Sequence, residues 1–130
     1  MTRRQDIYRD ALAVIVRDHA SDLLVETVAH EIGTSRRQLQ RVLEEVGGVT
    51  FRGLLTKVRM TRARHLLLET RAPVGVVARQ VGYSQAAQFA KTFRRFFGEV
   101  PSVYRTSPGL AAAAPAANGA AARRPVATAA

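Results

Sequence analysis

Apolar residues recur three and four positions apart along most of residues 5–105, and no segment alternates apolar and polar residues as a β-strand does. This spacing predicts helices over about 5–19, 24–31, 35–46, 50–69, 73–81, 84–97 and 101–105. Glycines follow several of these segments, and Ser35, Thr50 and Ser84 stand where a hydroxyl can accept a backbone amide at a helix start. The pattern therefore predicts an all-α fold of about seven helices.

The predicted core follows the apolar stripes of these helices. The third helix is expected to bury Leu39, Val42, Leu43 and Val46, and the long helix Phe51, Leu54, Leu55, Val58, Ala63, Leu66 and Leu67. Helical spacing also relates the aromatic residues Tyr83, Phe89, Phe93, Phe96, Phe97 and Tyr104. A base-stacking platform for single strands is an alternative for these aromatic residues, but their spacing favours a second core.

Two of the helical segments belong to a helix-turn-helix pattern that occurs twice. Six positions of the first copy correspond in order to six positions of the second. They are Val28, Gly33, Ser35, Leu39, Leu43 and Gly48 in the first copy, and Val77, Gly82, Ser84, Phe89, Phe93 and Gly98 in the second. The offset is 49 residues up to the serines (28 to 77) and 50 after them (39 to 89), which puts one additional residue into the second turn. A period of this length is typical of a duplicated supersecondary unit.

The chain is strongly basic, with 20 Lys and Arg residues against 10 Asp and Glu residues, and the excess lies in its C-terminal part. Residues 1–49 carry seven basic and eight acidic residues, whereas residues 50–105 carry eleven and two. Such a charge favours polyanionic partners. Cysteine is absent, which excludes disulfides and thiolate sites. No apolar run approaches the roughly 20 residues of a membrane span, so we expect a cytoplasmic protein without a membrane partner.

The composition changes at about Thr106, where Ala, Pro and Gly become dominant. Residues 106–130 lack large apolar side chains, apart from Leu110 and Val126, and are predicted to form a disordered tail. The remaining chain divides into a first helix-turn-helix subdomain (1–49), a linker helix (50–70) and a second helix-turn-helix subdomain (71–105).

Specific residues of the second half carry a family resemblance. They are Thr61-Arg62-Ala63-Arg64-His65-Leu66-Leu67, Val77-Ala78, Val81-Gly82-Tyr83-Ser84, Phe89, Phe93, Gly98, Pro101, Tyr104 and Arg105. In these residues the chain resembles the AraC/XylS family of bacterial transcription regulators, over about residues 7–105. The resemblance implies two helix-turn-helix units, joined by a long helix, that enter adjacent major-groove segments on one face of double-stranded DNA.

The resemblance also implies a stand-alone form of the DNA-binding domain, because the chain has no room for a ligand-binding or dimerisation domain. A monomer is expected to suffice on DNA, since both recognition helices lie in one chain. An excised fragment of a longer regulator is the alternative reading. RNA polymerase is a further candidate partner of such a transcription factor.

The helices that begin at Ser35 and Ser84 correspond to the two recognition helices of the family. On the family's pattern, Arg37, Gln40 and Arg41 stand where the first unit contacts bases and nearby phosphates, and Gln85, Ala86 and Lys91 stand at the corresponding places in the second. Arg can bind guanine and Gln can bind adenine through two hydrogen bonds. The complete predicted set is Ser35, Arg36, Arg37, Gln40, Arg41, Ser84, Gln85, Ala86, Gln88, Lys91, Arg94 and Arg95.

The second recognition helix has alanine where the family often has polar side chains. Ala86 and Ala87 can touch a thymine methyl group but cannot hydrogen-bond a base edge. Lys91, Arg94 and Arg95 are therefore expected to contact phosphates, which position a protein without specifying sequence. On the long helix, Arg59, Arg62 and Arg64 are expected either to reach phosphates or to pair with carboxylates such as that of Glu69.

Two other classes of function are alternatives. The first is a protein-interaction module that docks on an acidic partner, such as a polymerase subunit or another regulator. The second is an enzyme, which the sequence does not favour. It contains no acid–base pair, and the three histidines His19, His30 and His65 are too far apart for a local metal motif. We therefore expect no enzymatic activity, cofactor or metal.

Overall fold

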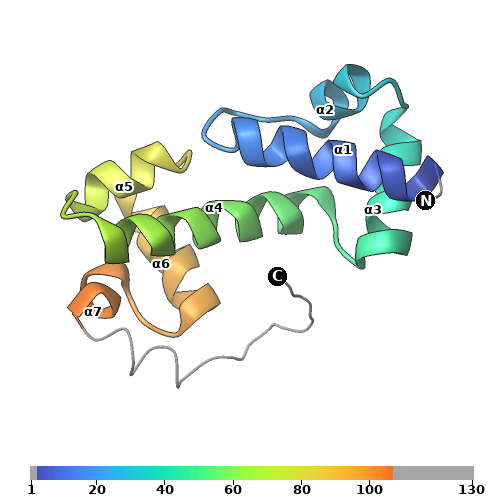
Figure 1. Ribbon diagram of the computed structural model, residues 1–130. Coiled ribbons are helices and arrows are strands. Elements are labelled where there is room, and N and C mark those ends of the chain that lie inside the picture. The colour runs from blue at the N-terminus through green and yellow to red at the C-terminus, as the bar shows by residue number, and fades with distance from the viewer. Residues whose placement is uncertain (1–2, 107–130) are drawn as a thin grey trace. The chain divides into compact units, whose positions relative to one another are not determined.

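The computed structural model describes residues 3–106, and within that range every regular element is a helix (Figure 1). The seven helices are α1 (Arg3–Asp18), α2 (Val25–Glu31), α3 (Arg36–Gly47), α4 (Phe51–Glu69), α5 (Val74–Gln80), α6 (Ala86–Phe97) and α7 (Pro101–Thr106). The all-α prediction is confirmed. The predicted tail lies outside the described residues except for Thr106, which is the last residue of α7.

The chain divides into two units between Arg59 and Met60, inside α4. We call Met1–Arg59 the first unit and Met60–Ala130 the second unit. The division follows from the side chains of α4, because Leu54 and Leu55 belong to the core of the first unit and Met60, Ala63 and Leu67 to that of the second. Met60, which the sequence analysis did not place in the core, is fully buried.

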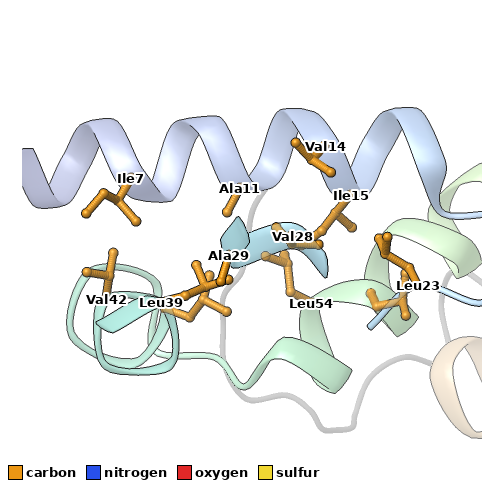
Figure 2. Packing of buried hydrophobic residues seen from close by; sticks show 12 residues of the cluster. Ile7, Ala11, Val14, Ile15, Leu23, Val28, Ala29, Leu39, Val42 and Leu54 are labelled. Carbon is orange, nitrogen blue, oxygen red and sulfur yellow. The ribbon is translucent and has the colours of Figure 1, made fainter. Parts of the chain in front are cut away.

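An aliphatic core holds the helices of the first unit together. Figure 2 shows Ile7, Ala11 and Ile15 projecting from α1 into a cluster that includes Val28 of α2 and Leu39 of α3. These positions recur at three and four residues, so each helix presents one continuous apolar stripe to the others. Full burial of such a side chain contributes about 1.5–3 kcal/mol, which makes this cluster the main source of stability in the unit.

Ion pairs connect every pair of helices among α1, α2 and α3. Arg4 of α1 lies 2.8 Å from Glu45 of α3, and Arg17 of α1 lies 2.8 Å from Glu31 of α2. Arg36 of α3 lies 2.8 Å from Glu26 of α2. Arg17 also bonds Asp18, which holds the pKa of the Asp18 carboxyl below its usual value. These groups lie at the surface, where water screens their attraction, so the pairs contribute little to stability.

The core of the second unit is largely aromatic. Phe89 and Phe93 of α6 are fully buried, and the Phe93 ring meets that of Tyr104 edge to face with centroids 5.2 Å apart. Tyr83, from the turn before α6, contacts Phe89 in the same geometry at 5.6 Å. Edge-to-face pairs are worth about 0.5–1.5 kcal/mol beyond the area they bury. The prediction that these aromatic residues form a core is confirmed, with the exception of Phe96.

Two arginines connect distant segments within their own units. Arg59 donates to the carbonyl oxygens of His19 and Ser21, at 2.8 and 2.9 Å, just after the end of α1. Arg105 donates to the carbonyl oxygens of Leu67 at 3.0 Å and Thr70 at 3.5 Å, at the end of α4. For Arg59, these bonds are made to carbonyl oxygens beyond the end of a helix, which have no helical partner, and contact with a DNA phosphate stays a prediction.

Val46 and Phe96 were predicted to be buried and are each 40% exposed. They stand 50 residues apart, at equivalent places in the last turns of α3 and α6. Neither side chain belongs to the core cluster of its unit, so the apolar stripe of each helix continues one turn past the core. Periodicity alone does not show where the partner helices stop.

Candidate nucleic-acid interface

The two helix-turn-helix turns have the same backbone hydrogen bonds. In the first unit, Gly33 and Thr34 donate to the carbonyl oxygens of His30 and Ala29 at 3.1 and 2.9 Å. In the second, Gly82 and Tyr83 donate to Arg79 and Ala78 at the same two distances. Gly33 has φ of 77° and Gly82 has φ of 97°, a conformation that side chains with a Cβ rarely adopt. The two turns therefore share the same backbone bonds up to Thr34 in the first unit and Tyr83 in the second.

The starts of α3 and α6 differ, because the additional residue of the second turn falls just before α6. Ser35 is the N-cap of α3, and its hydroxyl accepts the amide of Gln38 at 3.0 Å. The N-cap of α6 is Gln85, whose side chain makes no capping hydrogen bond. The prediction that Ser84 caps this helix was therefore wrong. Ser84 is the inserted residue, and Gln85, fifty positions after Ser35, takes the place of the cap.

The solvent-exposed face of α3 carries three of the predicted contact residues. Arg37, Gln40 and Arg41 are all exposed, lie three and four residues apart, and are opposite the buried Leu39. Among residues 3–106, no group forms a hydrogen bond or an ion pair with the side chain of any of these three. Arg36, at the start of the same helix, instead lies 2.8 Å from Glu26 of α2. The side chains on this face can donate several hydrogen bonds to a planar group such as a base edge.

The charges of α3 oppose its helix dipole. Arg36 and Arg37 occupy the first turn, where the dipole is positive, and Glu44 lies in the last turn, where it is negative. Each such placement costs about 0.3–1 kcal/mol at an exposed site. The arrangement concentrates positive charge at the N-terminal half of α3, where Arg37 has no partner among the described residues.

On α6 the order of charged and uncharged residues is the reverse of that on α3, because the first turn carries no charge and the last turn is basic. Ala86, Ala87 and Gln88 occupy its first turn, and Gln88 donates weakly to Thr92 at 3.5 Å. When positions are counted from the two N-caps, Arg37 corresponds to Ala87, Gln40 to Ala90 and Arg41 to Lys91. Gln85 and Ala86, which the sequence comparison matched to Arg37 and Gln40, are therefore not the equivalent positions. The one-residue shift follows from the insertion at Ser84.

Three cations lie in the middle and the last turn of α6. Lys91, Arg94 and Arg95 are exposed, and Arg94 and Arg95 stand in the last turn, where the helix dipole favours positive charge. They line an open hollow of about 500 Å³ together with Ala90, Gly98 and Val100. Among the described residues, none pairs with these three cations, so they can bind anionic groups without losing a protein partner.

The predicted site residues thus form two groups, one on each unit. Ser35, Arg36, Arg37, Gln40 and Arg41 gather at the start of α3, and Ser84, Gln85, Ala86, Gln88, Lys91, Arg94 and Arg95 extend along α6. Sequence reasoning missed Glu26, the partner of Arg36, and Val100 in the hollow. Glu26 could not be found by periodicity, because the pair joins two helices across the turn. Arg64 is used within the second unit, where its guanidinium lies 5.4 Å from the centre of the Phe97 ring.

The fold and the repeated turn define a helix-turn-helix protein, and comparison with known proteins gives its family. A family model described as a helix-turn-helix domain matches residues 28–107. The chain belongs to the AraC family of transcriptional regulators. This confirms the resemblance found in the sequence. The curated relatives that the chain matches include several transcriptional regulators.

Individual relatives agree with this assignment. The chain is 36% identical over 87 residues to the transcriptional activator RhaS of Escherichia coli, a match that covers 66% of this chain and 31% of RhaS. It is 34% identical to the C-terminal domain of AraT, a response regulator from Geobacillus stearothermophilus, with a TM-score of 0.76 and coverage of 82% and 88% of the two chains. The DNA-binding domain of the global transcriptional factor AdpA, solved in complex with a target DNA, is 27% identical with a TM-score of 0.69, and the match covers 75% and 92%.

The match is confined to one part of the longer relatives. The chain spans about a third of the length of the curated relatives that it matches. In residues 3–106, no helix combines the length and the apolar character that crossing a membrane requires.

Proposed function

We propose that the chain binds double-stranded DNA in a sequence-specific manner and regulates transcription, with α3 and α6 in adjacent major-groove segments. The observation that carries the proposal is the exposed face of α3. The side chains of Arg37, Gln40 and Arg41 are exposed and form no hydrogen bond or ion pair within residues 3–106, and the charges of their helix oppose its dipole. Arg and Gln are the side chains that bind guanine and adenine through two hydrogen bonds.

The two helices contribute differently in this proposal. α3 contacts base edges through Arg37, Gln40 and Arg41, whereas α6 contacts phosphates through Lys91, Arg94 and Arg95. Phosphate contacts supply affinity by releasing counterions, and base contacts supply discrimination. Because the helices differ, the DNA site is bipartite and asymmetric, and one copy of the chain is sufficient to bind it. The AdpA domain in complex with its target DNA supports double-stranded DNA as the ligand.

A second candidate function is docking on an acidic protein, such as a subunit of RNA polymerase or another regulator. The observation that favours it is the hollow at the end of α6, where Lys91, Arg94 and Arg95 surround the apolar Ala90 and Val100. A carboxylate-bearing peptide would satisfy such a surface as a phosphate does. In that case the first recognition helix would have no base to contact, so the chain would bind DNA without sequence preference.

The experiment that separates the two functions is in-vitro selection of random duplex DNA on the purified chain at about 150 mM salt, where non-specific binding is weak. Enrichment of a defined sequence, with two unlike elements about one helical turn apart, is the expected result. Recovery of unenriched DNA, with binding that disappears as salt rises, would refute sequence-specific binding and favour the acidic protein partner.

A further inference from the structure

The pair formed by Glu26 and Arg36 lies at the edge of the first recognition helix. Glu26 stands in the first turn of α2, a position that suits a carboxylate because the helix dipole is positive there. The residue before this helix, Leu24, offers no side-chain cap, yet the Glu26 carboxylate does not bond its own helix. It instead accepts a hydrogen bond from Arg36 Nη1 at 2.8 Å, across the helix-turn-helix turn.

Stability alone does not explain this pair. Its side chains are 57% and 56% exposed, so water screens their attraction and the pair contributes little to stability. The pair has a clear electrostatic consequence, however. Of the three arginines on α3, it neutralises the one in the first position and leaves Arg37 and Arg41 without a partner among residues 3–106.

We infer that Glu26 is a specificity-determining residue, which keeps the Arg36 guanidinium away from DNA phosphates. The inference rests on the proposed function and adds a residue that makes no contact with a base. A non-specific complex depends on phosphate contacts and shifts until the available cations meet phosphates. The complex on a selected site is held in one register by base contacts from Arg37, Gln40 and Arg41. Withholding one cation therefore weakens non-specific binding more than specific binding.

The test compares two DNA duplexes by fluorescence anisotropy over a series of salt concentrations. One duplex has the sequence enriched by selection, and the other has a random sequence of the same length. In Glu26→Gln the freed Arg36 should raise affinity for the random duplex about five- to tenfold, and the salt slope should become steeper by about 0.9, the value for one phosphate. Affinity for the selected duplex should rise about twofold or less, so the specificity ratio falls.

Two further variants isolate the role of the pair. Adding Arg36→Ala to Glu26→Gln should abolish both the gain in affinity and the change in slope, because no guanidinium is then released. Asp10→Asn changes the net charge by the same amount at an exposed residue of α1 that has no partner among the described residues. It should leave the specificity ratio at the wild-type value. Thermal melting of each variant shows whether the fold is kept.

Each outcome bears on a separate claim. If wild-type protein binds neither duplex at low salt, the proposed function fails. If it binds and Glu26→Gln raises both affinities by the same factor, or Asp10→Asn has an equal effect, Glu26 acts only through net charge and the inference is wrong. If Arg36→Ala does not reverse the effect of Glu26→Gln, then Arg36 is not the group that Glu26 holds.

Discussion

In the first unit, ion pairs join each helix of α1–α3 to the other two, whereas among residues 60–106 of the second unit no ion pair joins two helices. The difference follows from composition. Residues 3–59 contain ten basic and eight acidic residues, and residues 60–106 contain eight and two. The first unit therefore neutralises most of its charge internally and leaves a few polar groups of α3 exposed. The second leaves its cations available along α6.

The cores of the two units differ in the same way. The first is aliphatic and is built from three helices and the start of α4, whereas the second relies on Phe89, Phe93 and Tyr104. Despite this, the backbone bonds of the two turns are the same. A duplicated helix-turn-helix unit can thus keep its turn geometry while the packing and the surface charge of each copy change. On the proposed function, this difference in surface chemistry suits α3 to base edges and α6 to phosphates.

The largest effect on stability is expected from Arg105, which takes the place of ion pairs in the second unit. Arg105→Ala removes the bonds to the carbonyl oxygens of Leu67 and Thr70, and should lower the free energy of unfolding by about 1.5–3 kcal/mol, as for hydrogen bonds of charged groups. Urea denaturation measures this change in the free energy of unfolding. Arg71→Ala, which removes an exposed cation, is the control. An equal loss in both variants would mean that Arg105 contributes only charge.

Arg41 is the residue through which the first unit should show its preference for bases. Arg41→Ala should reduce affinity for the selected duplex by about 1–3 kcal/mol, with little change on random duplex, if its guanidinium binds a base edge. Anisotropy titrations on the two duplexes measure the difference, and Arg52→Ala, an exposed cation of α4, serves as the control. A uniform loss on both duplexes would make Arg41 a phosphate contact, and the contrast between α3 and α6 would be lost.

The two serines of the turns should differ in their effect on stability. Ser35→Ala removes the cap of α3 and should lower the free energy of unfolding by about 1 kcal/mol, whereas Ser84→Ala should change it little because Ser84 caps no helix. Gln85→Ser would supply the missing cap of α6 and should stabilise the second unit. Thermal melting compares the three variants. A similar loss for both alanine variants would restore Ser84 as a capping residue.

The smallest effect concerns Asp18, whose carboxyl pKa is lowered by the bond from Arg17. A carboxyl with a lowered pKa in the folded state stabilises the fold above its usual pKa of about 3.9, and this contribution is lost as the pH falls through the lower folded value. Unfolding followed between about pH 6 and pH 2 should therefore show a smaller loss of stability in Asp18→Asn than in the wild type. Identical pH profiles would mean that the pair does not persist in solution.

Much of this fold follows from spacing and from turn residues. The helices, the duplicated turn, Gly33, Gly82 and the cap at Ser35 were predicted, because these features depend on residues close together in the sequence. The extent of the core was not. Val46 and Phe96 continue the apolar stripes but lie beyond the partner helices, and Met60 was overlooked.

The candidate site was predicted for α3 more completely than for α6. Arg37, Gln40 and Arg41 follow a fixed count from their cap, whereas the insertion at Ser84 shifts the register of α6 by one residue. Partners that join separate helices, such as Glu26 for Arg36 and the His19 carbonyl for Arg59, have no signature in local spacing. Only the three-dimensional packing identifies them.

The central claim, that α3 discriminates bases while α6 supplies phosphate contacts, is tested most directly by salt-dependent affinities of two multiple variants. One variant replaces Lys91, Arg94 and Arg95 with alanine, and the other replaces Arg37 and Arg41. On the selected duplex, the first should lose up to about 2.7 of salt slope, at 0.9 per phosphate, and keep its preference over random duplex. The second should lose that preference with a smaller change in slope. The reverse assignment, with preference lost in the α6 variant and kept in the α3 variant, would contradict the account.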